Sequence, residues 1–359
     1  MRMTKSSRAR VGGVSLALAA CGLGLASPEV DAADRTIGEI VRLDPRLDHL
    51  VPGDAVIEVL ADGFRWAEGP VWDREGGRVL FSDIPHNTVH SWNEKEGLGV
   101  FLKPSGYTGE APFAGREPGS NGLAFDAQGR LVLCQHGDRR VARLEGGAAA
   151  PAPGSPAPTA PSFATLADRF DGRRLNSPND LVYAADGALY FTDPPYGRPK
   201  TFDDPDRELP FCGVYRLAPD GEVSLIVREL KAPNGIGLSP DGKTLYVNQS
   251  HPEQAVLMAY DVQPDGSVSR GRVLFDMTPL QGPHSPGLPD GLKVAQQGHI
   301  FATGPGGVLV LTPDGTHLGT FRTGVPTANC GFGDDGSILY ITANDMLCRI
   351  RLTTRGLGF

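Results

Sequence analysis

The sequence repeats one short pattern six times. In each repeat, a run of apolar residues leads into a turn that contains glycine, and a strand-like run with alternating apolar residues follows. Such a pattern predicts a β-hairpin, because glycine supplies the positive φ of a tight turn and β-branched and aromatic residues suit a pleated sheet. The turn glycines are Gly76, Gly129, Gly187, Gly242, Gly298 and Gly336.

The spacing of these hairpins predicts the architecture. Turn glycines recur roughly every 40 to 60 residues, which is the length of a four-stranded propeller blade. We therefore predict an all-β fold, a six-bladed β-propeller, formed by one domain over residues 33–359. The last repeat lies close to the C-terminus, so a strand at 347–352 is expected to share a blade with an N-terminal strand near 56–60 and close the ring.

Composition agrees with this fold and excludes one class of partner. The 359 residues include 47 Gly and 31 Pro, which favours many turns and few long helices. A net charge of −8 without a basic cluster in the mature part argues against a nucleic-acid partner. We expect one short helix around 37–43 and a mobile Pro/Ala-rich loop at 146–162 inside the second blade.

The first 32 residues have the order of an export signal. Basic residues precede an apolar run at 11–26 that is too short to span a membrane. The prediction is an exported protein, periplasmic or secreted. Cleavage after Ala26 or Ala32 is one alternative. The other is a lipid anchor on Cys21, since Leu18-Ala19-Ala20-Cys21 matches a lipobox.

Cysteines do not suggest a metal site. The chain has no CxxC pair and no cysteine and histidine cluster at zinc spacing. Most of the cysteines beyond the leader lie in strand-like apolar patterns, where a free thiol behaves as a small buried hydrophobe. We expect buried thiols rather than a disulfide at Cys134, Cys212, Cys330 and Cys348.

One position in each repeat carries an oxygen-bearing side chain. Counting back eight residues from the turn glycine in the first five repeats gives Glu68, Asn121, Asn179, Asn234 and Asp290. In the sixth repeat, Asn329 stands seven residues before Gly336. Equivalent positions of a propeller face one axis, so these side chains are expected to converge. Turn capping is the alternative for any single Asx residue, but it explains Glu68 poorly.

A ring of carboxylate and amide oxygens without thiolates suits one hard or borderline divalent cation. Ca²⁺ is the most natural occupant, with Mg²⁺, Mn²⁺ and Zn²⁺ as alternatives. Glu68 and Asp290 would neutralise the ion, whereas two unpaired carboxylates in a narrow channel would repel each other.

Several motifs of the chain resemble a known family. WAEGPVW, SNGLAFD, LNSPNDLVY with FTDPPYG, PNGIGLSPDG, and PDGLKV with ATGPGGV resemble the family of senescence marker protein, gluconolactonase and luciferin-regenerating enzyme, over about 56–344. The bacterial gluconolactonase branch is the most similar. The resemblance implies a six-bladed propeller whose single metal is held by Glu68, Asn179, Asn234 and Asp290, with Asn121 contacting substrate. An arginine that some animal members carry is Gly119 here.

The function that this resemblance implies is hydrolysis of a small lactone. The metal would polarise the carbonyl group and Asp290 would act as general base on water. No GxSxG motif suggests a serine nucleophile. Phosphotriester hydrolysis and a non-enzymatic binding propeller are the alternatives. Further substrate-binding candidates near the mouth of the channel are His136, Asn176 and Tyr196.

Overall fold

The computed structural model describes residues 35–147 and 160–359. All of them fall within one compact unit that runs from Ala32 to Phe359. The predicted export signal with Cys21 and its lipobox lies outside the described residues, as does most of the Pro/Ala-rich segment, so these features remain predictions. None of the described residues forms a helix long and apolar enough to cross a membrane.

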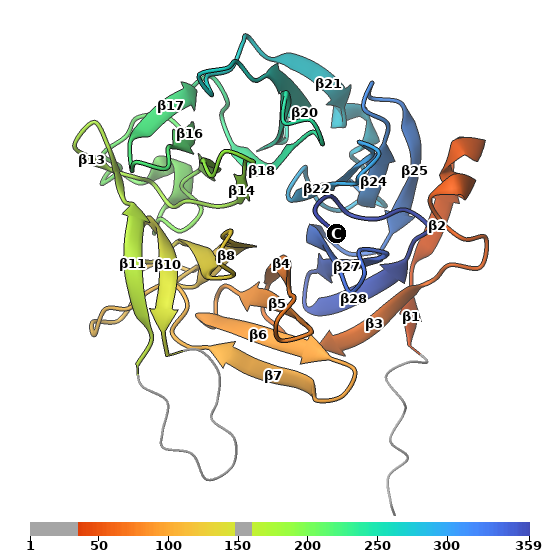
Figure 1. Ribbon diagram of the computed structural model, residues 1–359, viewed down its shortest axis with the longest axis horizontal. Helices are drawn as coiled ribbons and strands as arrows, with labels where there is room; N and C mark the ends of the chain where they lie inside the picture. Colours follow the sequence, from red (N-terminus) through yellow and green to blue (C-terminus); the bar gives the residue numbers. More distant parts are fainter. Residues whose placement is uncertain (1–34, 148–159) are drawn as a thin grey trace, which may run out of the picture. The chain divides into compact units, whose positions relative to one another are not determined.

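Six antiparallel sheets surround one centre, as the repeats predicted (Figure 1). The first blade contains β4 (Ala67–Asp73), β5 (Arg78–Asp83), β6 (Thr88–Asn93) and β7 (Gly97–Leu102). The second contains β8 (Ser120–Phe125), β9 (Leu131–Gln135), β10 (Arg140–Gly146) and β11 (Ser162–Ala167). The third contains β14 (Leu181–Tyr183), β15 (Leu189–Asp193), β16 (Gly213–Leu217) and β17 (Val223–Val227).

The remaining blades include two that also receive strands from the N-terminal part of the chain. The fourth contains β18 (Pro233–Leu238), β19 (Thr244–His251), β20 (Gln254–Asp261) and β21 (Arg272–Asp276). The fifth contains β22 (Leu292–Val294), β23 (Ile300–Gly304), β24 (Gly307–Leu311), β25 (His317–Arg322) and β2 (Glu39–Arg42). The sixth contains β26 (Thr327–Gly333), β27 (Ile338–Ala343), β28 (Met346–Arg351), β3 (Ile57–Asp62) and β1 (Thr36–Ile37).

Elements outside the blades are short. A small hairpin joins β12 (Arg169–Phe170) to β13 (Arg173–Arg174). The described part of the chain otherwise has only 3-10 turns, at Pro45–His49, Thr201–Asp203 and Thr278–Leu280.

The innermost strands form a closed ring. In chain order β4, β8, β14, β18, β22 and β26 each contact the next, and β26 contacts β4. Figure 1 shows the labelled members of this set on the inner side of their sheets. Radial repetition leaves only the outer strand of each blade as an edge, which limits edge-to-edge aggregation.

The ring closes where the sequence predicted. β3 from the N-terminal part pairs with β28 from the C-terminal part, with Val59 opposite Cys348. Ile57 and Val59 are buried in the hydrophobic cluster between the fifth and sixth blades. Strands from both ends of the chain therefore share one blade, so opening the ring requires breaking a sheet rather than only a loop.

Two local predictions were wrong. Residues 37–43 contain strands instead of a short helix, because β1 extends the sixth blade and β2 extends the fifth, with Val41 opposite Thr320. The unpaired edge of β25 offers this segment a hydrogen-bonding partner that sequence periodicity does not reveal. In the first hairpin, the positive φ falls on Gly77 (φ 58°) rather than on Gly76.

The four cysteines beyond the leader are buried free thiols, as expected.

The closing strand gives a stability prediction. Val59 is 1% exposed, whereas Val56, three residues earlier, is 48% exposed. Val59→Asp would bury an unpaired carboxylate between blades and is expected to lower the free energy of unfolding by at least about 3 kcal/mol. Val56→Asp is the matched control and is expected to change it by less than about 0.5 kcal/mol. Urea unfolding followed by tryptophan fluorescence measures both, and equal stability of the two variants would contradict the role of β3 in closing the ring.

Candidate active site

Five of the six side chains that were predicted to converge, called the ring residues below, line one cavity, whereas Asn329 lies behind Glu68 and bonds it. The volume of this cavity is about 210 Å³, and its walls include Glu68, Asn121, Asn179, Asn234 and Asp290. The first four expose 1%, 3%, 2% and 4% of their surface, and Asp290 is partly buried. Each comes from the inner strand of a blade or from a residue shortly before it. The structure thus brings together the four predicted metal ligands and the predicted substrate contact Asn121.

Irregular pairing of three inner strands helps to direct Glu68, Asn121 and Asn234 inward. The register of β4 against β5 shifts after Glu68, and that of β8 against β9 shifts between Ser120 and Leu123. The same irregularity occurs in β18, between Pro233 and Ile236. A bulge of this kind leaves residues unpaired and re-aims their side chains.

Glycines after the ring residues let neighbouring blades meet closely. A Cβ on Gly122 would lie 2.7 Å from the carbonyl oxygen of Asn179, and one on Gly235 would lie 2.1 Å from that of Asp290. The amides of these two glycines instead donate to the same carbonyl oxygens, at 2.8 and 3.0 Å. The backbone of each of these ring residues is therefore fixed by the blade before it. Glycine directly after the ring position is visible in the sequence and could have predicted this contact.

Electrostatics of the cavity favour a cation. Burial raises the pKa of Glu68 well above its ordinary value, although the hydrogen bond from Gly69 N lowers it, and the charge of Asp180 raises it further. Burial also raises the pKa of Asp290, and the charges of Glu68 and Asp180 add to this effect. Within 35–147 and 160–359, neither carboxylate forms an ion pair with a basic side chain, although Asn329 Nδ2 donates to Glu68 Oε2 at 3.1 Å. Both carboxylates would be stabilised by a nearby positive charge.

The donor set fits a hard ion rather than a thiolate- or imidazole-binding one. Among the described residues, no group of three or more His, Cys, Asp or Glu side chains is arranged as a metal site. An ion in this cavity would therefore depend on the amide oxygens of Asn179 and Asn234 together with the carboxylates of Glu68 and Asp290. Mixed carboxylate and amide oxygens are the ligands that Ca²⁺ takes in proteins.

The other predicted substrate contacts are placed differently. Tyr196 lines the cavity, whereas His136 and Asn176 do not. Both are fully buried. Asn176 Nδ2 donates to the carbonyl oxygens of Asp193 and Phe211, so this side chain holds the turn that leads to the third blade.

Five lining residues were not predicted. Trp66 lies two residues before Glu68, and Ser250 lies near the end of β19. Glu117 belongs to the loop between β7 and β8, which has no counterpart in the repeat pattern. Hairpin periodicity could not have identified these loop and strand-end residues. The full set is Trp66, Ile84, Glu117, Ser250 and Leu288.

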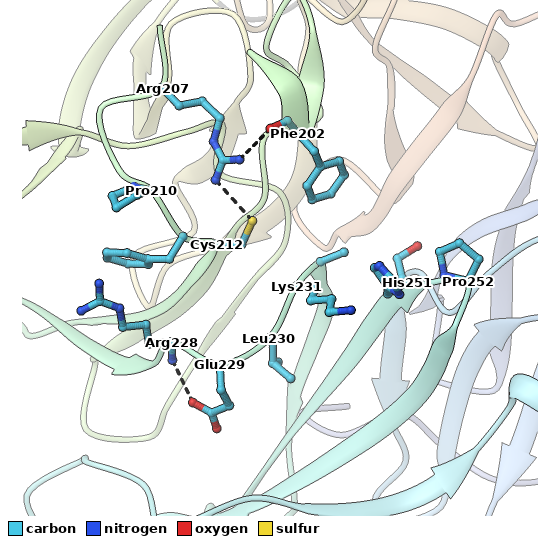
Figure 2. Close-up of a pocket in the computed structure, with 13 residues that line it drawn as sticks. Phe202, Arg207, Pro210, Cys212, Arg228, Glu229, Leu230, Lys231, His251 and Pro252 are labelled. Carbon is cyan, nitrogen blue, oxygen red and sulfur yellow. Dashed lines mark hydrogen bonds between the residues drawn. The ribbon is translucent and has the colours of Figure 1, made fainter. Parts of the chain in front are cut away.

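Two larger cavities adjoin the central one. A cavity of about 510 Å³ shares Trp66, Glu117 and Tyr196 with it. Another, of about 590 Å³, shares Ser250. Figure 2 shows this second cavity, with Cys212 on one side and His251 on the other. The central site therefore adjoins two spaces that could hold parts of a larger ligand.

Known proteins resemble this chain in sequence as well as in fold. The SMP-30/Gluconolactonase/LRE-like region matches residues 66–345, which include every residue of the ring. The chain belongs to this family.

Members and solved structures of the SMP-30/gluconolactonase family align along most of the chain. A gluconolactonase of Zymomonas mobilis is 37% identical over 326 residues, covering 89% of this chain and 88% of its own length. The pentonolactonase XacC of Haloferax volcanii is 28% identical over 300 residues, covering 80% of this chain and 84% of its own length. The structure of a Xanthomonas campestris gluconolactonase matches with a TM-score of 0.70 at 32% identity, covering 89% of this chain and 99% of that one.

Proposed function

We propose that the chain is a lactone hydrolase whose central cavity holds one divalent cation. The observation that carries the proposal is the convergence of Glu68, Asn179, Asn234 and Asp290 on one cavity. The identity of 37% to a gluconolactonase over 89% of the chain supports the reaction class. A small-ring lactone is the substrate that a cavity of about 210 Å³ would accommodate.

These four side chains would hold the ion, and Ca²⁺ suits their oxygens best. When bound, the cation would polarise the lactone carbonyl group as a Lewis acid. The chain's part is to hold the carbonyl group near Asp290 and to limit the access of bulk water. The closely packed glycines after the ring residues keep these groups in fixed positions, which favours a single reactive geometry.

Asp290 is our candidate for the general base. It is less buried than Glu68, and it lies at the cavity wall where a water molecule can reach it. The carboxylate takes a proton from water as the water oxygen bonds to the carbonyl carbon. The ring C–O bond then breaks, and the proton passes to the departing ring oxygen. The product is a hydroxy acid, and Asp290 returns to its starting form.

An assay with three substrates tests the reaction class. Purified protein with Ca²⁺ is incubated with glucono-δ-lactone, δ-valerolactone and paraoxon, and acid release is followed above the spontaneous rate. We expect lactone turnover without comparable phosphotriester cleavage. Cleavage of paraoxon alone would establish the phosphotriesterase alternative, and no turnover of any substrate would indicate a binding propeller.

Metal affinity should depend on pH in a defined direction. Only ionised carboxylates bind Ca²⁺, and burial raises the pKa of both Glu68 and Asp290 in the ion-free protein. Protons therefore compete with the ion at a higher pH than they would at ordinary carboxylates. Calorimetric titration is expected to show at least about tenfold tighter binding at about pH 8 than at about pH 5.5. Equal affinity at both values would contradict the assignment of these carboxylates as ligands.

A further inference from the structure

Glu117 is a carboxylate at the active site that does not belong to the ring. It lies in the loop between β7 and β8, outside the six repeats, and it lines both the central cavity and the adjoining cavity of about 510 Å³. Its side chain is 31% exposed. Its position at the junction of two cavities lets it contact a ligand that occupies either of them.

A buried histidine fixes the orientation of this carboxylate. His136 is fully buried, and its Nδ1 lies 2.9 Å from Glu117 Oε2. The backbone of His136 donates to Gly119 O at 3.1 Å, and a Cβ on Gly197 would lie 2.6 Å from the Cβ of His136, so little room is left for the ring to move. His136 Nε2 is buried without a partner among the described residues. Because Nδ1 faces a carboxylate oxygen, which can only accept, we assign the imidazole N–H to Nδ1, which donates to Glu117 Oε2.

Two acceptors at the cavity lack a donor from the protein. Glu117 uses Oε2 for His136, and no described residue donates to its Oε1. Asn121 is 3% exposed, and its Oδ1 is buried without a partner in the described part of the chain. Buried acceptors are normally satisfied, so Asn121 Oδ1 favours a ligand that brings a hydroxyl donor, and the partly exposed Glu117 Oε1 is free to accept a second one. The ring of a sugar lactone carries several such donors, whereas an unsubstituted lactone carries none.

We propose that Glu117, oriented by His136, accepts a hydrogen bond from a ring hydroxyl of the substrate and makes the site selective for polyhydroxylated lactones. The inference rests on the proposed lactone hydrolysis and assigns to Glu117 the preference for a hydroxylated ring. A site built to bond a substrate hydroxyl discriminates against analogues that lack it, because its own polar groups are then left unpaired. His136 acts through Glu117 and is a positioning residue.

Binding of a non-reacting ring tests the inference without requiring turnover. The probe is 1,5-anhydroglucitol, titrated into Ca²⁺-loaded protein by calorimetry or ligand NMR. Glu117→Gln is expected to weaken its binding about 10- to 100-fold, the usual loss for a hydrogen bond to a charged group. Glu110→Gln, at an exposed position in the same loop, is the matched control and is expected to bind as the wild type does. Unchanged binding by Glu117→Gln, or no binding by the wild type, would overturn the inference.

Turnover of two lactones distinguishes a role of Glu117 in substrate selectivity from a role in the chemical step. The ratio of kcat/KM for glucono-δ-lactone to that for δ-valerolactone is expected to fall about 10- to 100-fold in Glu117→Gln. An equal loss on both substrates would assign Glu117 to the chemical step and overturn the inference.

His136→Leu should lower the same kcat/KM ratio, whereas His136→Asn, which keeps a nitrogen donor near the Nδ1 position, should largely restore it. If both His136 variants behave alike, the positioning role is wrong. Absence of all lactone turnover would refute the proposed function and leave the binding test to decide on Glu117.

Discussion

Replacement of Glu68 by alanine is expected to weaken Ca²⁺ binding by at least about 10²-fold and to remove lactone turnover at micromolar Ca²⁺. Glu68 supplies one of only two carboxylates in the proposed ligand set, and the number of charged ligands sets calcium affinity over several decades. Glu68 is 1% exposed, so a solvent water is not expected to take the place of its carboxylate as an equivalent ligand. Calorimetry and the lactone assay measure the two effects on the same preparation.

Loss of the fold is not expected to explain the Glu68→Ala result. In the ion-free protein, burial raises the pKa of Glu68, which means that its ionised form is disfavoured in the native state. The ion-free variant should therefore be about as stable as the ion-free wild type, while Ca²⁺ should raise the Tm of the wild type alone. Glu75→Ala, in the exposed turn of the same blade, is the matched control. Full calcium content and turnover in Glu68→Ala would refute the ligand assignment.

Asp290→Asn is expected to lower kcat by about 10² to 10⁴ at saturating metal, the range that a positioned general base contributes. The substitution keeps the shape of the side chain and one ligand oxygen, but it removes the group that accepts a proton from water. Asp290 N donates to Thr303 O and its carbonyl oxygen accepts from Asn248, so the backbone geometry does not depend on the carboxylate. The fold and the binding of a lactone analogue should persist.

Asn179→Asp is the contrast for this experiment. It leaves a ligand oxygen in place and adds a negative charge to the same cavity, so it should tighten the ion without removing a base. Its kcat is expected to stay within about tenfold of the wild type, since the base contributes most of the loss expected for Asp290→Asn. A metal-loaded Asp290→Asn enzyme with nearly normal kcat would show that Asp290 is only a ligand and that the base lies elsewhere.

The fold could be predicted because it repeats. The turn-glycine pattern and its spacing determine both the blade number and the position of the closing strands β3 and β28, which pair as expected. The segment at 37–43 could not be predicted in the same way. Its strands depend on the free edges of β3 and β25, and the contact with β25 joins segments that lie far apart in the sequence. Local periodicity carries no information about such an edge.

Five of the six repeat positions reach the central cavity, whereas most of the lining residues outside the repeat were not predicted. Glu68 and Asp290 occupy the same position in their blades, and both reach the central cavity. Glu117 and Ser250 also reach it, but their positions follow from the path of a loop and the length of a strand. Asn176 is polar and close in sequence to Asn179, yet its amide is directed to backbone carbonyl groups. Sequence proximity to a ligand does not determine which way a side chain points.

Stepwise reconstitution with metal tests the central proposal most directly. Protein freed of divalent ions by chelation is titrated with Ca²⁺, and bound ion and glucono-δ-lactone turnover are measured on the same samples. The proposed mechanism predicts negligible turnover without the ion and a rise that saturates at one bound ion per chain, with Glu68→Ala showing neither at the same concentrations. Full turnover by the ion-free wild type, or one tightly bound ion without any effect on turnover, would contradict it.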